Sequence, residues 1–154
     1  MATATEFAKR LMRAAKQDFS KQEDALRGAA DAFQESQFTN FAAKEDSDGV
    51  PWKPHAPLTI ALYGVHPLLR LEGIMKEAAT GGSGSFQTVS IGRKVSRIQV
   101  GISKVAVPYA KTHQDGRGRI PRRQFYYLHK SRRPEVLRAF RVRAIHNVRG
   151  RLGW

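Results

Sequence analysis

An apolar stripe near the amino end limits what this chain can fold into. Nine apolar side chains fall within one arc of about 140° when successive residues are turned by about 100°, as in an α-helix. They are Phe7, Leu11, Met12, Ala15, Phe19, Leu26, Ala29, Ala30 and Phe33. A continuous helix over this span would be about 40 Å long at about 1.5 Å per residue. The stripe covers the chain's own sheet or also serves a neighbouring subunit, and Gly28 permits a break into two helices.

The composition predicts one domain over residues 1–154 that is held together by packing alone. The chain is 41% hydrophobic and contains no cysteine, so disulfides, thiolate metal sites and a cysteine nucleophile are excluded. The longest uncharged stretch, residues 54–69, falls short of the about 20 residues that a membrane helix needs. Basic residues interrupt the first apolar residues, so we expect no secretory signal and no membrane partner.

Charge is distributed unevenly and divides the domain into three parts. The net charge is −2 over residues 1–50, +5 over 51–110 and +11 over 111–154, for a total of +14. We expect a helical segment over 1–43 at the mixed-charge end, and an Arg-rich helix and tail over 129–154 at the cationic end. A strongly cationic end predicts attraction to polyanions or to acidic protein surfaces.

The middle of the chain shows the patterns of a loop, a short helix and a strand pair. Turn-forming residues over 44–57 predict a loop, in which Trp52 either caps the core or docks on another chain. Residues 67–80 read as a short helix weakened by Gly73, with Leu68, Leu69, Leu71, Ile74 and Met75 available to bury. After a glycine-rich connection, apolar residues alternate with polar ones around 88–92 and 97–102, which indicates an antiparallel pair turning at 92–94.

The last third adds a further candidate strand and a helix. Residues 120–128 are the candidate strand, and 134–148 have helical periodicity, with Pro134 suited to the first turn and Gly150 to the stop. Together these patterns predict an α+β fold. In it a long amino-terminal amphipathic helix packs on a small antiparallel sheet, with a short mid-chain helix and a carboxyl-terminal helix.

No pattern indicates a cofactor or a metal ion. The glycines at 81–84 lack the following Lys and Ser or Thr of a phosphate-binding loop, and the five histidines lack zinc-ligand spacing. His113, followed by Gln114 and Asp115, is a weak candidate for a general base with an acidic partner, so a small His-dependent hydrolase stays as an alternative. We expect no enzyme activity and no cofactor.

Arginine dominates the carboxyl end. From Arg117 to Arg151 there are eleven arginines and one lysine, interleaved with aromatic residues. Arginine favours bidentate pairing with carboxylate or phosphate, so the segment suits nucleic acid or an acidic subunit interface. The candidates for interaction or for lining a DNA channel are Arg122, Arg132, Arg133, Arg138, Arg141, Arg143 and Arg149.

Five short blocks in a fixed order resemble the phage virion morphogenesis family, the tail-completion or head-tail joining proteins of long-tailed, Mu-like phages. The blocks are GVPWKP at 49–54, LRLEG at 69–73, VSIG at 89–92, YAKTHQDG at 109–116 and IPRRQF at 120–125. The motif residues are Trp52, Gly73, Tyr109, Ala110, His113, Gln114, Gly116, Pro121, Arg123 and Phe125. The sequence departs from the family pattern at Glu72, Ile74, Asp115 and Gln124.

The resemblance spans about residues 45–128 and implies an α+β core there, in a structural virion protein without catalysis or cofactor. Such a protein is made in the cytoplasm of the bacterial host and sits in the neck or at the upper end of the tail. There it forms a ring of identical copies, expected to be a hexamer, around the DNA channel. Its partners are itself, other neck proteins such as the connector or the tail terminator, and phage DNA through non-specific contact.

The motif residues also suggest structural roles. Tyr109 and Ala110 are expected to pack inward at the end of a strand, while His113 and Gln114 satisfy backbone groups in a turn. Gly116 takes positive φ there. Pro121 fixes the entry to the next strand, Phe125 anchors the core, and one of the two arginines between them points outward.

A ring of copies calls for complementary faces. We expect the acidic amino-terminal helix of one copy to lie near the Arg-rich end of a neighbour or of another neck protein, with some arginines lining the DNA channel. The main alternative is a free basic protein that binds nucleic acid through the same arginines.

Overall fold

The computed structural model describes residues 22–69, 72–92 and 95–152 of the 154-residue chain. Its elements in chain order are the helices α2 (Glu23–Ala43), α3 (Pro57–Tyr63) and α4 (Ile74–Ala79), the strands β1 (Ser85–Ser90) and β2 (Arg97–Ile102), α5 (Ala110–Asp115), the 3-10 turn η2 (Lys130–Arg132) and α6 (Arg133–Leu152). The order confirms the α+β class. The part of the predicted amino-terminal stripe before residue 22 lies outside the described residues.

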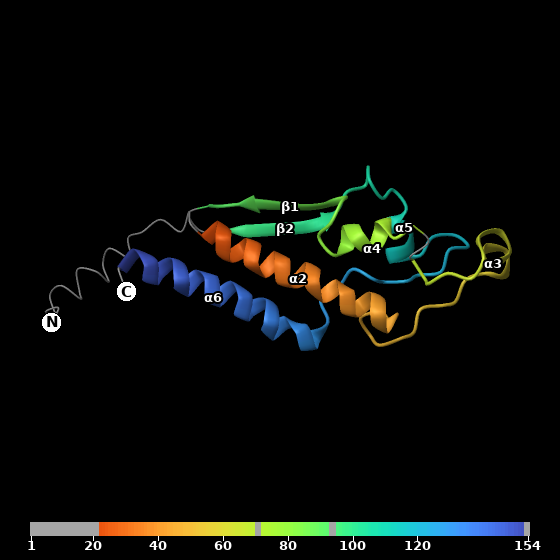
Figure 1. Cartoon of the computed structure of the whole chain (residues 1–154), viewed down its shortest axis with the longest axis horizontal. Helices are drawn as coiled ribbons and strands as arrows, with labels where there is room; N and C mark the ends of the chain where they lie inside the picture. The colour runs from red at the N-terminus through yellow and green to blue at the C-terminus, as the bar shows by residue number, and fades with distance from the viewer. Residues whose placement is uncertain (1–21, 70–71, 93–94, 153–154) are drawn as a thin grey trace, which may run out of the picture.

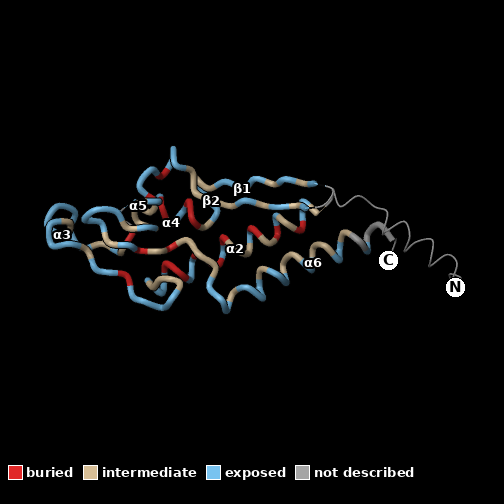
Figure 2. The backbone as a smooth tube through the Cα atoms, turned by 180° about the vertical axis from the view of Figure 1, so that it is seen from behind, coloured by how far each residue is buried: buried red, intermediate tan, exposed pale blue. Residues whose placement is uncertain are grey.

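Helix α2 forms the middle layer of the molecule. The strands β1 and β2 lie along one side of it and α6 along the other, with the short helices α3, α4 and α5 gathered toward one end (Figure 1). Buried residues recur along the whole of α2, from Ala25 to Phe41, because the helix is covered from both sides (Figure 2). The α2 stripe thus serves the chain's own sheet and its own α6.

Gly28 does not break α2, although the sequence permitted a break there. It is buried inside the helix, and a Cβ at this position would stand 2.5 Å from Cδ of Arg143 on α6. The missing side chain therefore makes room for an arginine of the opposite helix. This is a tertiary reason for the glycine, and the local pattern contains no sign of it.

The two strands pair in antiparallel register as the alternation predicted. Ser85 faces Ile102 and Ser90 faces Arg97, which places Val89 opposite Ile98. The half-buried positions alternate with exposed ones along β1, so one face of the sheet lies on α2 and the other stays open.

A compact aromatic cluster beside the end of α2 forms the core. Phe41 meets Trp52 edge to face with ring centroids 5.9 Å apart, and it also meets Phe125 at 5.5 Å. The indole nitrogen of Trp52 donates to the carbonyl oxygen of Gln124 at 3.1 Å, so its polar atom is satisfied. Trp52 and Phe125 are buried, which confirms that Trp52 caps the core and Phe125 anchors it.

The short mid-chain helix begins later than the sequence predicted. Gly73 is the N-cap of α4 with φ of 81°, and residues 67–69 and 72 before it are not helical, while Leu71 lies outside the described residues. Leu69 is buried with φ of 60°, while Ile74 is left 38% exposed. Met75 supplies the burial expected of this helix. An additional helix, α3, forms within residues 54–69, where we had expected none.

Residues 120–128 are not a strand. Apart from an isolated bridge between Arg117 and Ile120, the segment runs extended without a strand partner. The predicted stop of the last helix at Gly150 is also wrong, because α6 continues to Leu152. Pro134 does lie in its first turn, where a missing N–H costs nothing.

Candidate assembly interface

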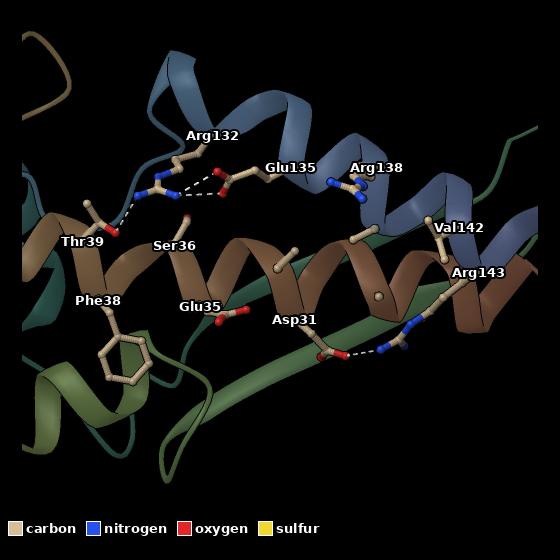
Figure 3. A pocket seen from close by; sticks show the side chains of 13 residues that line it. Asp31, Glu35, Ser36, Phe38, Thr39, Arg132, Glu135, Arg138, Val142 and Arg143 are labelled. Carbon is tan, nitrogen blue, oxygen red and sulfur yellow. Dashed lines mark hydrogen bonds and ion pairs between the residues drawn. The ribbon is translucent and has the colours of Figure 1, made fainter.

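A groove with a volume of about 840 Å³ lies between α2 and α6. Figure 3 shows side chains of both helices around it, with Asp31 and Glu35 on α2 and Arg138 on α6. Small residues of the floor, such as Gly28 and Ala139, keep the helices close. The groove therefore places carboxylates of one helix opposite guanidinium groups of the other.

Part of this charge complementarity is satisfied within the chain. Arg143 lies 3.3 Å from a carboxylate oxygen of Asp31 and 3.5 Å from one of Asp24. Arg132 pairs with Glu135 at 2.8 Å and donates to Thr39 Oγ1 at 3.4 Å (Figure 3). These pairs are partly exposed, so each contributes only about 0–1 kcal/mol. Arg143 pairs with carboxylates of α2, and Arg132 pairs with Glu135 and contacts Thr39 of α2, whereas we had expected both arginines to be available to a neighbouring copy.

Exposed arginines remain on α6, with Arg138 at the groove and the others away from its lining. There are four of them among the residues whose burial is described, and the ion pairs formed among the described residues reach none of these four. They are Arg133, Arg138, Arg141 and Arg149. Between them Leu137, Val142 and Ile145 are each more than half exposed. A helix surface that combines free guanidinium groups with aliphatic side chains suits contact with another macromolecule.

Side-chain amides take the place of a strand partner for the extended segment 124–127. Gln114 accepts from the N–H groups of Phe125 and Tyr126 and donates to the Tyr126 carbonyl, at 3.0–3.1 Å. From α2, Gln37 accepts from the Tyr127 N–H at 3.3 Å, and Asn40 donates to the Phe125 and Tyr127 carbonyls. We call these three side chains the amide clamp. The motif Gln114 therefore satisfies backbone groups, as expected, while Gln37 and Asn40 were missed.

Arg123 points inward and Arg122 outward. The Arg123 side chain is 5% exposed, and it donates from Nε to the Lys53 carbonyl at 2.9 Å and from Nη2 to the Pro54 carbonyl at 2.8 Å. Burial lowers the pKa of its guanidinium. Arg122 is exposed and donates to Gln124 Oε1 at 3.0 Å. Arg123 is thus a structural tie to the loop that follows Trp52.

The other motif residues divide between confirmed and corrected roles. Ala110 is buried and Gly116 has φ of 72°, as predicted. Tyr109 is 44% exposed, because it precedes the short helix α5 instead of ending a strand. Pro121 is half-buried at the entry to the extended segment, not on an edge strand. Gly73 lies at the N-cap of α4 with positive φ.

The proposed pairing of His113 with Asp115 does not occur. Asp115 forms an ion pair with Lys111 at 2.7 Å on the exposed side of α5. The ring Nδ1 of His113 is buried and has no hydrogen-bond partner among the described residues, so His113 satisfies no described backbone group through this nitrogen. Its carbonyl does so instead, accepting from the Arg123 N–H at 2.7 Å. Burial, and then the nearby Arg123 and His55, lower the pKa of His113.

Acidification is expected to destabilise the fold through His113. Its pKa is below the usual 6.5 in the folded chain, so the unfolded chain binds the proton more readily. The contribution of neutral His113 to the free energy of unfolding is fully present above about pH 6.5. It is lost as the pH falls through the pKa that His113 has in the folded chain. His55, whose pKa is lowered by burial and by His66, adds to the same slope.

Urea unfolding measured at several pH values tests this expectation. His113→Gln should flatten the fall in the free energy of unfolding below about pH 6.5, compared with the unaltered protein. An unchanged slope in His113→Gln would contradict the assignment.

A projecting arm lies at the end of the molecule opposite the start of α2 (Figure 1). The arm is residues 54–69 with α3 at its tip, and no residue of α3 is buried. His55 and His66 close its base, with ring centroids 4.2 Å apart and His55 Nε2 3.2 Å from the His66 carbonyl oxygen. The pocket between the arm and the body has a volume of about 470 Å³. Composition had shown only that this stretch is uncharged.

Comparison with protein-family models, with curated proteins and with solved structures finds no match to this chain. Within the described residues, no helix is long and apolar enough to cross a membrane. The same residues contain no group of three or more histidine or acidic side chains placed to hold a metal ion. The function therefore has to be argued from the surfaces and from the motif residues themselves.

Proposed function

We propose that this protein is a structural component of a tailed-phage virion, a tail-completion or neck protein that forms a ring joining head and tail around the DNA channel. The observation that carries the proposal is the exposed surface of α6, where Arg138 at the groove and Arg141 and Arg149 away from it stand exposed beside aliphatic side chains. Such a surface suits docking on acidic protein surfaces and on passing DNA.

The motif residues support a protein that works through its shape. The side chain of Gln114 forms hydrogen bonds with backbone groups of 125–126, and that of Arg123 with carbonyls of 53–54. Phe125 fills the core. These residues carry the resemblance to the phage family, and in this fold they join the segments around the core instead of presenting reactive groups to a substrate. This use fits a rigid building block.

The proposed assembly is a homo-oligomeric ring, with a hexamer as the expected copy number. A ring closes when one face of each copy meets a different face of the next. The elongated molecule offers different faces at its two ends, the arm at one and the terminal half of α6 toward the other (Figure 1). The proposed location is the virion neck or upper tail, with the connector, the tail terminator and phage DNA as neighbours.

Charge reversal on α6 tests the proposal. In phage that depend on the variant protein, Arg138→Glu, Arg141→Glu and Arg149→Glu together are expected to lower the yield of joined head-tail particles at least tenfold. The reason is that the glutamates would repel the acidic protein surfaces and the DNA phosphates that the arginines attract. Electron microscopy counts the joined particles, and protein analysis of purified virions detects the polypeptide.

The matched control reverses three exposed basic residues elsewhere, Lys53→Glu, Arg97→Glu and Lys104→Glu, with the same change in net charge. It should leave joining intact. Joined particles that lack this polypeptide would refute the proposal. Equal loss in the two triple variants would refute the role of α6, because net charge alone would then explain the defect.

Free nucleic-acid binding is the second candidate, favoured by the same exposed arginines. Filter binding across salt separates the two functions. A monomer that binds DNA with a log–log salt slope of about −0.9 per neutralised phosphate, and that is absent from virions, would support the alternative. A His-dependent hydrolase is tested by His113→Ala, which should leave the biological activity intact.

A further inference from the structure

The arm exposes several large apolar side chains to solvent. Leu58 is 70%, Leu62 65%, Tyr63 59% and Val65 91% exposed. All four lie within eight consecutive residues. Contiguous apolar patches beyond a few hundred Å² on a soluble protein ordinarily mark an interaction site.

The arm is anchored at its base rather than packed along its length. Arg123 donates to the carbonyls of Lys53 and Pro54, and the rings of His55 and His66, which meet at a tilt of 40°, close the loop. These contacts fix where the arm leaves the body, while no residue of α3 is buried. A projection held in this way needs little ordering when it binds, which favours affinity.

The two sides of α3 differ. Thr59 and Tyr63, one turn apart, line the pocket between the arm and the body. Leu58 and Leu62, also one turn apart, are not among the lining residues and are largely exposed. Side chains at i and i+4 share a helix face, so Leu58 and Leu62 form an outward apolar ridge with Val65 beyond it. We call these three residues the arm ridge.

The pocket offers an apolar wall for such a ridge. Its lining includes Leu69, Ile74, Met75, Tyr109, Ile120 and Pro121. Its volume of about 470 Å³ lies within the range of about 300–1,000 Å³ of clefts that enclose small groups. The exposed sides of Ile74, Tyr109 and Ile120, at 38–44%, are otherwise uncovered.

Charge indicates which molecule covers the ridge. Each copy carries +14, so two copies repel wherever their charged surfaces meet. Residues 54–69 form the longest stretch free of Lys, Arg, Asp and Glu, so the uncharged ridge can approach a pocket lined in part by Glu72, Arg119 and Arg123 without like-charge repulsion. An acidic partner would gain nothing from this surface and has the arginines of α6 available instead.

We propose that the arm ridge of one copy docks into the arm–body pocket of a second copy of this chain. The contact joins two different surfaces, so it repeats from copy to copy and closes when the rotation permits. The inference rests on the proposed function in that it supplies the contact between ring neighbours. It follows the helix-in-groove mode of recognition, with Leu58 and Leu62 as anchors.

Cysteine cross-linking tests the contact directly, because the chain contains no cysteine of its own. Leu62→Cys and Ile120→Cys are prepared as separate full-length variants, mixed in equal amounts and oxidised. We expect a disulfide-linked dimer in the mixture and at most traces with either variant alone. Val105→Cys, 94% exposed and outside both surfaces, is the control partner for each.

Two results would overturn the inference. Efficient dimers of Leu62→Cys alone would mean that arms meet arms, and a mixture no better linked than the Val105→Cys controls would mean that the arm does not reach the pocket. Sedimentation provides a second measurement. The double variant Leu58→Asp with Leu62→Asp should weaken self-association at least tenfold, whereas Val105→Asp should not. Equal association of the unaltered protein, the double variant and Val105→Asp would also overturn the inference.

These outcomes are separate from those of the proposed function. A protein that cross-links from arm to pocket but is absent from virions would refute the virion assignment and leave the contact standing. A protein present in joined particles that shows no arm-to-pocket link would refute the contact alone.

Discussion

Gly116→Ala is expected to lower the free energy of unfolding by roughly 3 kcal/mol or more, because strain and collision act together. Gly116 caps α5 with φ of 72° and ψ of 132°, a conformation that side chains rarely adopt. A Cβ there would lie 2.7 Å from the backbone nitrogen of Arg122 and 2.9 Å from its Cα. The backbone atoms of Arg122 cannot move away without a large energetic cost, because they are bonded to the buried Arg123.

Gly118→Ala is the matched control two residues away. Gly118 has φ of 59°, and a Cβ would meet nothing within 4 Å. Only the left-handed backbone is then penalised, at about 1 kcal/mol. Chemical unfolding of both variants measures the difference. Equal losses would show that the approach of Arg122 to Gly116 does not matter for stability.

Gln114→Ala is expected to cost about 3 kcal/mol, since three backbone hydrogen bonds at about 1 kcal/mol each disappear together. The Phe125 and Tyr126 N–H groups and the Tyr126 carbonyl lose their amide partner. The segment around Phe125 has no strand beside it to replace these bonds. Thermal and urea unfolding report the loss of stability.

Gln114→Glu refines the same test, since a carboxylate can accept from both N–H groups but cannot donate to the carbonyl. It should retain part of the stability that Gln114→Ala loses. Gln99→Ala, at an exposed position of β2, should change stability by no more than about 0.5 kcal/mol. Gln114→Ala as mild as Gln99→Ala would refute the amide clamp.

Short-range patterns predicted most of the elements. The period-two alternation identified β1 and β2, and Pro134 and the helical periodicity identified the start of α6. Gly116 was predicted to have positive φ and does. Each of these depends on residues that are close in the sequence, where backbone geometry and the exposure of alternate side chains are decided.

The same local rules failed where partners come from far along the chain. Residues 120–128 looked like a strand, but their hydrogen bonds go to Gln37, Asn40 and Gln114. No pattern in that segment reveals that amides on two helices take the place of a neighbouring strand. Arg122 and Arg123 were equally basic in sequence, and only the carbonyls of 53 and 54 turned Arg123 inward.

The arm and the use of the arginines divide in the same way. By itself the sequence determined that residues 54–69 are uncharged, that cationic charge gathers at the carboxyl end, and that the fold is α+β, because composition and periodicity are properties of the chain. Only the tertiary structure decided that the uncharged stretch projects as an arm and that Arg143 is occupied by Asp31 while Arg141 stays exposed. The physical reason is that burial and ion pairing depend on which segments the fold brings side by side. Asp31 and Arg143 are 112 positions apart in the sequence, so no local pattern can reveal that they are neighbours.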